Sequence, residues 1–152
     1  MPLPTAPQQA VCVLAFDTST ERLAVGVAAA GQMHTCNAAG GAVASATLLP
    51  RVQALLAQAG LALADLQAVA FGCGPGAFTG LRTACAVAQG LGYGLGLPLL
   101  PVDSLLIVAE DARLQAAPQA PDLDVAVAMD ARMDEVYAAR YRWQGGHWQV
   151  LQ

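Results

Sequence analysis

The sequence predicts an α/β fold in which a mixed sheet is flanked by helices. Short apolar runs of strand length alternate with longer runs that carry apolar residues at helical spacing. Three of the short runs follow one another near the N-terminus, separated by turn-forming residues, which indicates an antiparallel meander. A glycine-rich turn at 72–82 then joins a strand-like run to a helix-like run. A meander followed by strand–helix units is typical of such a sheet.

The composition predicts a well-packed, mildly acidic protein. Hydrophobic residues make up 56% of the 152 positions, charged residues only 12%, and the formal net charge is −4. A chain of this charge is not expected to bind nucleic acid on its own. So few charges also favour burial of part of the surface against a partner. The four cysteines form no CxxC pair, which predicts reduced thiols and a cytoplasmic location.

No membrane segment is expected. The stretch 83–102 carries no charge, but Pro98, Pro101 and several glycines predict a helix followed by a buried strand rather than a membrane span. Residues 1–10 lack a positive charge ahead of an apolar stretch, so we expect a loose tail and not a signal peptide.

Strands are expected wherever short apolar runs lie between turn-forming residues. The polar residues at 17–20 follow the first run and are expected either to turn the chain or to hold a metal–phosphate ligand. The expected strands are 11–16, 23–30, 33–38, 68–71, 97–102, 125–129, 135–142 and 148–151.

The first helix is expected at 46–59, because its leucines and Val52 fall on one helical stripe. Pro50 is tolerated in the first turn of a helix, so the helix proper is expected to begin near Leu48 or Leu49. Gly60 is expected to end it.

The glycine-rich turn at 72–82 leaves two interpretations open. It is either a tight packed turn or an anion site at a helix N-terminus, with Thr79 in the position of an N-cap. A dinucleotide fingerprint needs an acidic residue about 20 positions on, and a P-loop needs a lysine; the sequence has neither. The possible phosphate or turn site comprises Asp17, Thr18, Ser19, Gly74, Gly76, Thr79 and Arg82.

The second helix is expected at 80–94. Small residues recur every four positions along it and form a ridge of Gly80, Ala84, Ala88 and Gly92. Such a ridge lets another element approach closely, at the low end of the usual helix spacing of about 8–10 Å. The ridge is expected to pack either on the sheet or first helix of this chain, or on helices of a partner.

The remaining chain predicts a third helix and the start of another unit. Asp103 or Ser104 is expected to cap a helix that ends near Arg113. The proline-containing stretch 114–123 resembles a linker. We therefore expect a first lobe at 11–113 and a second unit at 124–152.

Four stretches resemble one family of proteins. They are VLAFDTSTERLAVGV (13–27), LLPRVQALLAQAG (48–60), the segment 68–105 that contains GPGAFTGLR, and VAMDARMDEVYAARY (127–141). The order and spacing of these motifs resemble the TsaB (YeaZ) family, subunits of the bacterial tRNA threonylcarbamoyladenosine machinery.

The resemblance implies an actin-like, ribonuclease-H-like fold with two related lobes. It also implies a non-catalytic subunit that pairs with a TsaD-like paralogue, which transfers threonylcarbamoyl to the adenosine 3′ of the anticodon. A TsaE-like ATPase would join the complex, ATP and Mg²⁺ would belong to the assembled complex, and tRNA would be reached only through it. The family pairs through its first two helices, which here implies an interface of Pro50, Arg51, Ala54, Gln58, Gly80, Ala84, Ala88 and Gly92.

The residues themselves give no sign of a catalytic site. His34 and His147 are the only histidines, and the sequence contains no His-x-x-x-His, GxSxG or HExxH motif. Neither a bound metal nor a cofactor of its own is therefore expected. Two alternatives remain: an actin-like ATPase that uses Asp17, Thr18 and the Gly74–Gly76 turn, and a homodimer formed through the same helices.

The sequence departs from the family in two ways. Ala44 stands where relatives often carry a histidine, six residues before the helix proline. Relatives are also about half as long again, so we expect a truncated chain with an incomplete second lobe. A strand edge is then expected to be exposed around 143–151.

Overall fold

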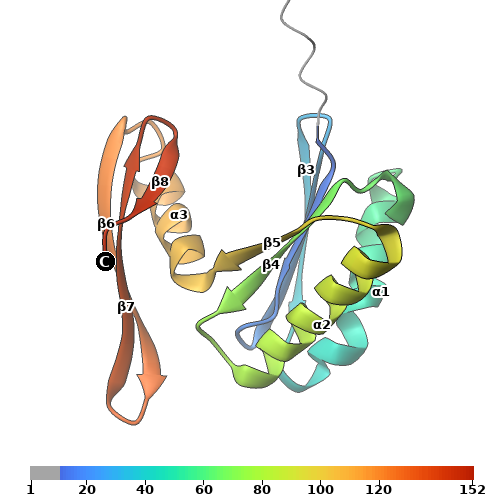
Figure 1. Ribbon diagram of the computed structural model, residues 1–152, viewed down its shortest axis with the longest axis horizontal. Helices are drawn as coiled ribbons and strands as arrows, with labels where there is room; N and C mark the ends of the chain where they lie inside the picture. The colour runs from blue at the N-terminus through green and yellow to red at the C-terminus, as the bar shows by residue number, and fades with distance from the viewer. Residues whose placement is uncertain (1–10) are drawn as a thin grey trace, which may run out of the picture.

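The computed structural model describes residues 11–152, which form two sheets with helices packed against them (Figure 1). The tail expected at 1–10 lies outside these residues. Among the described helices, none is both long and apolar enough to cross a membrane. The uncharged stretch instead forms most of α2 (Phe78–Leu95) and the greater part of β5 (Leu99–Asp103).

The first sheet has the strand order β3-β2-β1-β4-β5. β1 (Val13–Asp17), β2 (Arg22–Ala29) and β3 (Gln32–Ala39) form the predicted antiparallel meander. β4 (Ala68–Gly74) and β5 are parallel to β1. The carboxyl ends of β1, β4 and β5 therefore meet at one end of the sheet, where ligands bind in many open α/β sheets.

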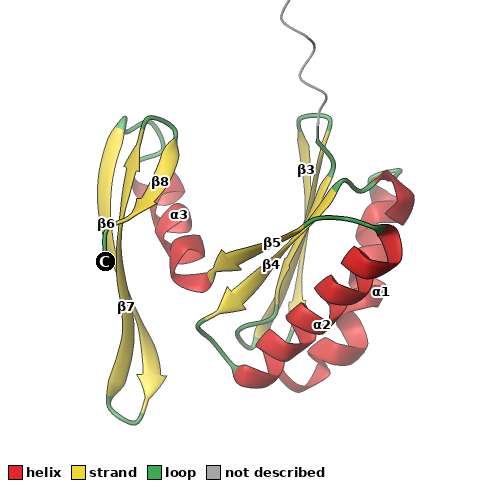
Figure 2. Cartoon of the chain, in the orientation of Figure 1, coloured by secondary structure: helices red, strands yellow, loops and turns green. Residues whose placement is uncertain are grey.

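Two helices cover one face of this sheet (Figure 2). α1 (Ala44–Gln58) packs on β2 and β3, and α2 packs on β1, β4 and β5. Short 3₁₀ turns at Gly41–Val43 and Leu63–Asp65 lead into α1 and β4. The core between helices and sheet is aliphatic, and its fully buried members include Leu14, Leu23, Val27, Leu48, Val52 and Val69.

The prediction for the start of α1 is wrong. The helix begins at Ala44, so Pro50 lies in its interior rather than in its first turn. Proline cannot donate a hydrogen bond to the carbonyl of Ala46, four residues earlier. Both residues are exposed, so water can replace the missing bond.

β5 also differs from its prediction as a buried strand. It forms one edge of the first sheet, and Leu100 is 47% exposed. Apolar residues in a short run cannot by themselves distinguish a central strand from an edge strand.

The second sheet is antiparallel, with the order β6-β7-β8. It consists of β6 (Asp122–Arg132), β7 (Glu135–Gln144) and β8 (His147–Val150). α3 (Ser104–Ala116) packs on it and is capped by Asp103, whose Oδ1 accepts hydrogen bonds from the amides of Leu105 at 2.7 Å and Leu106 at 3.3 Å. Because α3 and β6 extend into the stretch predicted as a linker, only 117–121 connects them.

A network of side chains joins α3 to the second sheet. Arg113 binds the carboxylate of Glu110 through two hydrogen bonds of 2.8 Å and stacks on the ring of Trp143. The indole N–H of Trp148 donates to Glu110 at 2.9 Å. These partners, Arg113 first, hold the pKa of Glu110 below its usual value. The ion pair lies within α3, and the contacts to the second sheet are the hydrogen bond from Trp148 and the stacking of Arg113 on Trp143.

Candidate functional site

The polar turn after β1 and the glycine-rich turn after β4 are bound to each other. The hydroxyl of Thr18, which is completely buried, donates to the carbonyl of Gly80 at 2.6 Å. The amide of Ala77 donates to the carbonyl of Ser19 at 2.7 Å. Asp17 Oδ1 accepts from both the amide and the hydroxyl of Ser19, at 2.8 and 2.6 Å, which closes the first turn.

Three glycines make this contact possible because they leave room for the turn after β1. A Cβ atom at Gly72 would overlap the carboxylate of Asp17, and one at Gly80 would overlap the carbonyl of Thr18. A Cβ at Gly76 would lie 2.6 Å from the Cβ of Ser19. Much of the glycine pattern is thus explained by close packing, as the first of the two open interpretations expects.

The N-terminus of α2 lacks a side-chain cap. The helix begins at Phe78 with Ala77 as N-cap, so the prediction that Thr79 caps it is wrong. Thr79 lies within the first turn and is exposed. The chain reaches helical geometry earlier than the sequence indicates because the Ala77 amide is already held by Ser19.

This helix end opens into a cleft between the two sheets, of about 640 Å³. The interlobe cleft is lined on one side by both turns and on the other by the β6–β7 hairpin. Its lining comprises Ser19, Thr20, Glu21, Gly76, Ala77, Phe78, Thr79, Met129, Asp130, Ala131, Arg132 and Tyr137.

Three of the seven residues proposed for the turn site, Ser19, Gly76 and Thr79, line the cleft. The other four, Asp17, Thr18, Gly74 and Arg82, do not. Asp17 and Thr18 support the turn from behind, and a Cβ at Gly74, whose φ is +104°, would lie 3.1 Å from Leu81. Arg82 stacks on the ring of Phe78, with 4.0 Å between its guanidinium carbon and the ring centre.

Sequence reasoning missed Arg132 and Tyr137 as cleft residues. Both residues belong to the stretch 127–141, whose sequence does not indicate that its hairpin lies opposite the glycine-rich turn. Arg132 and the two following residues adopt positive φ angles, and Asp130 Oδ1 accepts the Arg132 amide at 2.7 Å. This tight turn places the arginine at the cleft.

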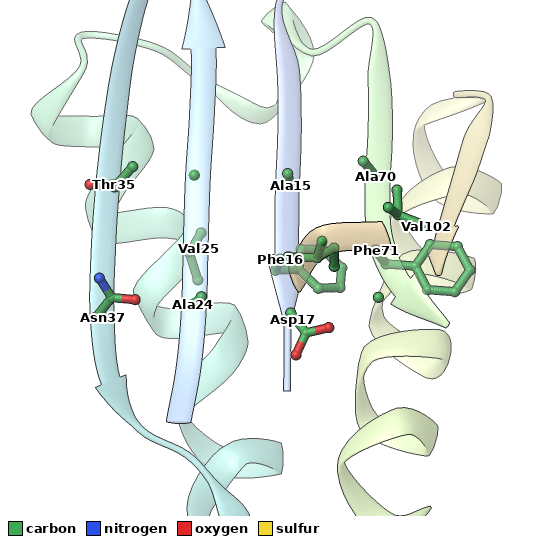
Figure 3. Close-up of a pocket in the computed structure, with 13 residues that line it drawn as sticks. Ala15, Phe16, Asp17, Ala24, Val25, Thr35, Asn37, Ala70, Phe71 and Val102 are labelled. Carbon is green, nitrogen blue, oxygen red and sulfur yellow. The ribbon is translucent and has the colours of Figure 1, made fainter. Parts of the chain in front are cut away.

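The other face of the first sheet carries a shallow apolar trough of about 390 Å³ (Figure 3). Small residues form its floor, among them Ala15, Ala24 and Ala70, and Phe71 and Val102 lie to one side. Asp17 lies in its wall, and the Oδ2 atom of this residue is buried without a hydrogen-bond partner among the described residues. The trough is mostly apolar and offers little for catalysis.

The small-residue ridge of α2 faces the interior of this chain. Gly80, Ala84, Ala88 and Gly92 are the buried residues of the helix. A Cβ at Gly92 would lie 2.7 Å from Leu99 on β5. Because these four positions are buried within the chain, the expectation that they contact a partner is wrong, and the alternative of packing on the chain's own sheet is correct.

The four positions proposed on α1, Pro50, Arg51, Ala54 and Gln58, are all exposed. On α2 the exposed stripe is a different one, at Arg82, Ala86, Gln89 and Tyr93, opposite the buried ridge. Tyr93 is 95% exposed. We call these eight positions the outer helix face.

Within residues 11–152, no three His, Cys, Asp or Glu side chains come together in a way that would hold a metal ion.

Comparisons with known proteins identify the family. The family model for TsaD, described as tRNA N6-adenosine threonylcarbamoyltransferase, matches residues 42–151. The tRNA threonylcarbamoyladenosine biosynthesis proteins TsaB of Haemophilus influenzae and Escherichia coli are 39% and 38% identical over 85% and 90% of this chain. The chain belongs to the family that this model describes, in its TsaB (YeaZ) branch.

The solved structure of YeaZ from Pseudomonas aeruginosa agrees. It is 42% identical, covers 93% of this chain and superimposes with a TM-score of 0.84. The predicted actin-like, ribonuclease-H-like fold is thereby confirmed, with its five-stranded mixed sheet and flanking helices. The chain spans 53% and 58% of the two TsaB relatives and 65% of that YeaZ chain.

Proposed function

We propose that this chain is a non-catalytic subunit that pairs with a TsaD-like paralogue and supports threonylcarbamoyl transfer to tRNA. The observation that carries the proposal is membership of the TsaB branch, whose relatives are named for tRNA threonylcarbamoyladenosine biosynthesis. Binding would act by shifting the partner toward its active arrangement.

The outer helix face is the surface we propose for this pairing. α1 and α2 lie side by side, and their exposed positions form one surface with few charges. Tyr93 presents a large ring to solvent and is the type of residue that is enriched at protein interfaces. Arg51 and Arg82 give this surface positive charge, so an acidic rim on the partner would complement it.

The test is size-exclusion chromatography with light scattering, on this chain alone and mixed with its cognate TsaD-like protein. A one-to-one heterodimer is expected. Separate elution of two folded proteins would contradict the proposal.

A matched pair of variants, each with one exposed alanine replaced by tryptophan, locates the surface. Ala54→Trp adds bulk to the centre of the outer helix face and is expected to weaken pairing at least tenfold. Ala112→Trp adds the same bulk to an exposed position of α3 and is expected to leave pairing unchanged. Equal pairing by both variants would remove the outer helix face from the proposal. Both positions are exposed, so neither change should unfold the chain.

In the assembled complex we place a TsaE-like ATPase beside the pair, with ATP and Mg²⁺ belonging to the complex and tRNA reached only through it. A cytoplasmic location suits this role.

The alternative of nucleotide binding by this chain rests on the interlobe cleft. The uncapped N-terminus of α2 and Arg132 would attract phosphate, whereas Glu21 and Asp130 oppose it. Among the described residues, no three His, Cys, Asp or Glu side chains come together at this cleft to hold a metal ion. Calorimetry with ATP on the isolated chain, repeated with Arg132→Ala, distinguishes this alternative from the first proposal.

A further inference from the structure

The two sheets have four edge strands among the described residues, β3 and β5 in the first and β6 and β8 in the second. An edge strand has unpaired backbone N–H and C=O groups that can pair with another strand, and most proteins block this with proline, charges or short strands.

Three of these edges carry such a device. β5 contains Pro101, which has no N–H to donate. β6 carries aspartates at both ends and an arginine, and β8 is only four residues long.

β3 carries none. It is eight residues long, reads QMHTCNAA, and contains no proline, glycine, aspartate, glutamate, lysine or arginine. Three of its residues, His34, Cys36 and Ala38, are half-buried, and Cys36 and Ala38 pack on the core under α1. Thr35 and Asn37 are exposed on the open face of the sheet (Figure 3). The strand is thus held in an extended shape, and its outer edge pairs with no other strand among the described residues.

We infer that β3 pairs antiparallel with β3 of a second copy of this chain, which joins two five-stranded sheets into one continuous sheet. A strand without charged residues places no like charges opposite each other when it meets its own copy. Centred on Thr35, the pairing sets Thr35 against Thr35 and Met33 against Asn37 of the second copy. Cross-strand threonine pairs are among the favourable ones.

The contact is small, since eight residues at about 3.4 Å each span only about 27 Å. It falls short of the roughly 800 Å² per partner of a standard interface, so a weak, concentration-dependent dimer is expected. This surface is distinct from the outer helix face, and the inference does not depend on the proposed pairing with a TsaD-like protein.

Sedimentation velocity of the chain over concentrations up to about 1 mM tests the inference. A reversible monomer–dimer equilibrium is expected. Thr35→Lys places two lysines opposite each other and is expected to weaken the dimer at least tenfold. The control Gln149→Lys adds the same charge to β8 and should leave the dimer unchanged.

Circular dichroism establishes that each variant is folded, and Asn37→Lys, at the next exposed position of β3, replaces Thr35→Lys if that variant does not fold. A monomer at every concentration overturns the inference. So does a dimer that withstands lysine on β3, because such a dimer must use another surface.

Discussion

At the scale of single residues, the tightest constraint lies where Gly80 meets the turn after β1. Its carbonyl accepts the buried hydroxyl of Thr18, and its Cα lies against the Thr18 carbonyl. Gly80→Ala is expected to lower the free energy of unfolding by about 2–3 kcal/mol, because either the helix or the turn must shift. Urea unfolding followed by circular dichroism measures this.

Gly90 provides the control on the same helix. A Cβ there meets nothing within 4 Å, so Gly90→Ala is expected to raise stability by up to about 1 kcal/mol through helix propensity. Similar losses for both variants would mean that Gly80 is not limited by space.

At the scale of secondary-structure elements, Glu110 is the main polar link between α3 and the second sheet. Glu110→Gln keeps the shape but weakens the bonds to Arg113 and Trp148. A loss of about 1–2 kcal/mol is expected; the full value of a buried ion pair does not apply, because Glu110 is 37% exposed. Tryptophan fluorescence during urea unfolding follows the second sheet directly.

Asp111→Asn is the neighbouring control, because that carboxylate accepts a hydrogen bond from Gln115 on the surface and takes no part in the link to the second sheet. It should change stability by less than about 0.5 kcal/mol. An equal effect of the two substitutions would show that the link through Glu110 contributes nothing particular.

Most elements could be predicted from the sequence because apolar periodicity and turn residues determine them locally. The meander, the three helices and the hairpin of β6 and β7 lie within a few residues of their predicted positions. Local rules failed where the surroundings of a residue, and not its sequence neighbours, decide the outcome. Pro50 is tolerated inside α1 because its surroundings are exposed, and Ala77 replaces Thr79 as the N-cap because Ser19 holds its amide.

The candidate site was only half predictable, for a physical reason. A ridge of small residues has the same pattern whether it packs on its own sheet or on a partner, so the pattern of α2 could not say which side would be buried. Arg132 was beyond prediction because the sequence does not show which hairpin will lie opposite the glycine-rich turn.

At the scale of the whole molecule, the two sheets are tied together by Asp103. It ends β5, caps α3 and accepts the hydroxyl of Tyr141 from β7 at 3.2 Å. Burial, together with the nearby charge of Asp103, raises the pKa of Tyr141 from 10.0 to about 12. The connection between the lobes therefore depends on a protonated tyrosine.

This pKa predicts how stability depends on pH in the alkaline range. The folded state retains the Tyr141 proton more tightly than the unfolded state, so its contribution is complete below pH 10 and is lost as the pH rises toward 12. The loss should approach about 2–3 kcal/mol in urea unfolding. Tyr141→Phe removes the titrating group, and an unchanged alkaline decline in that variant would assign it to other residues.

The first sheet and both of its covering helices are contiguous in the chain, since β1 begins at Val13 and β5 ends at Asp103. Every strand and helix of that lobe therefore leaves the ribosome before any strand of the second sheet. Domains generally fold as units during synthesis, with the N-terminal one first. The lobe that carries the outer helix face can accordingly fold, and become available to a partner, while translation of the same molecule continues.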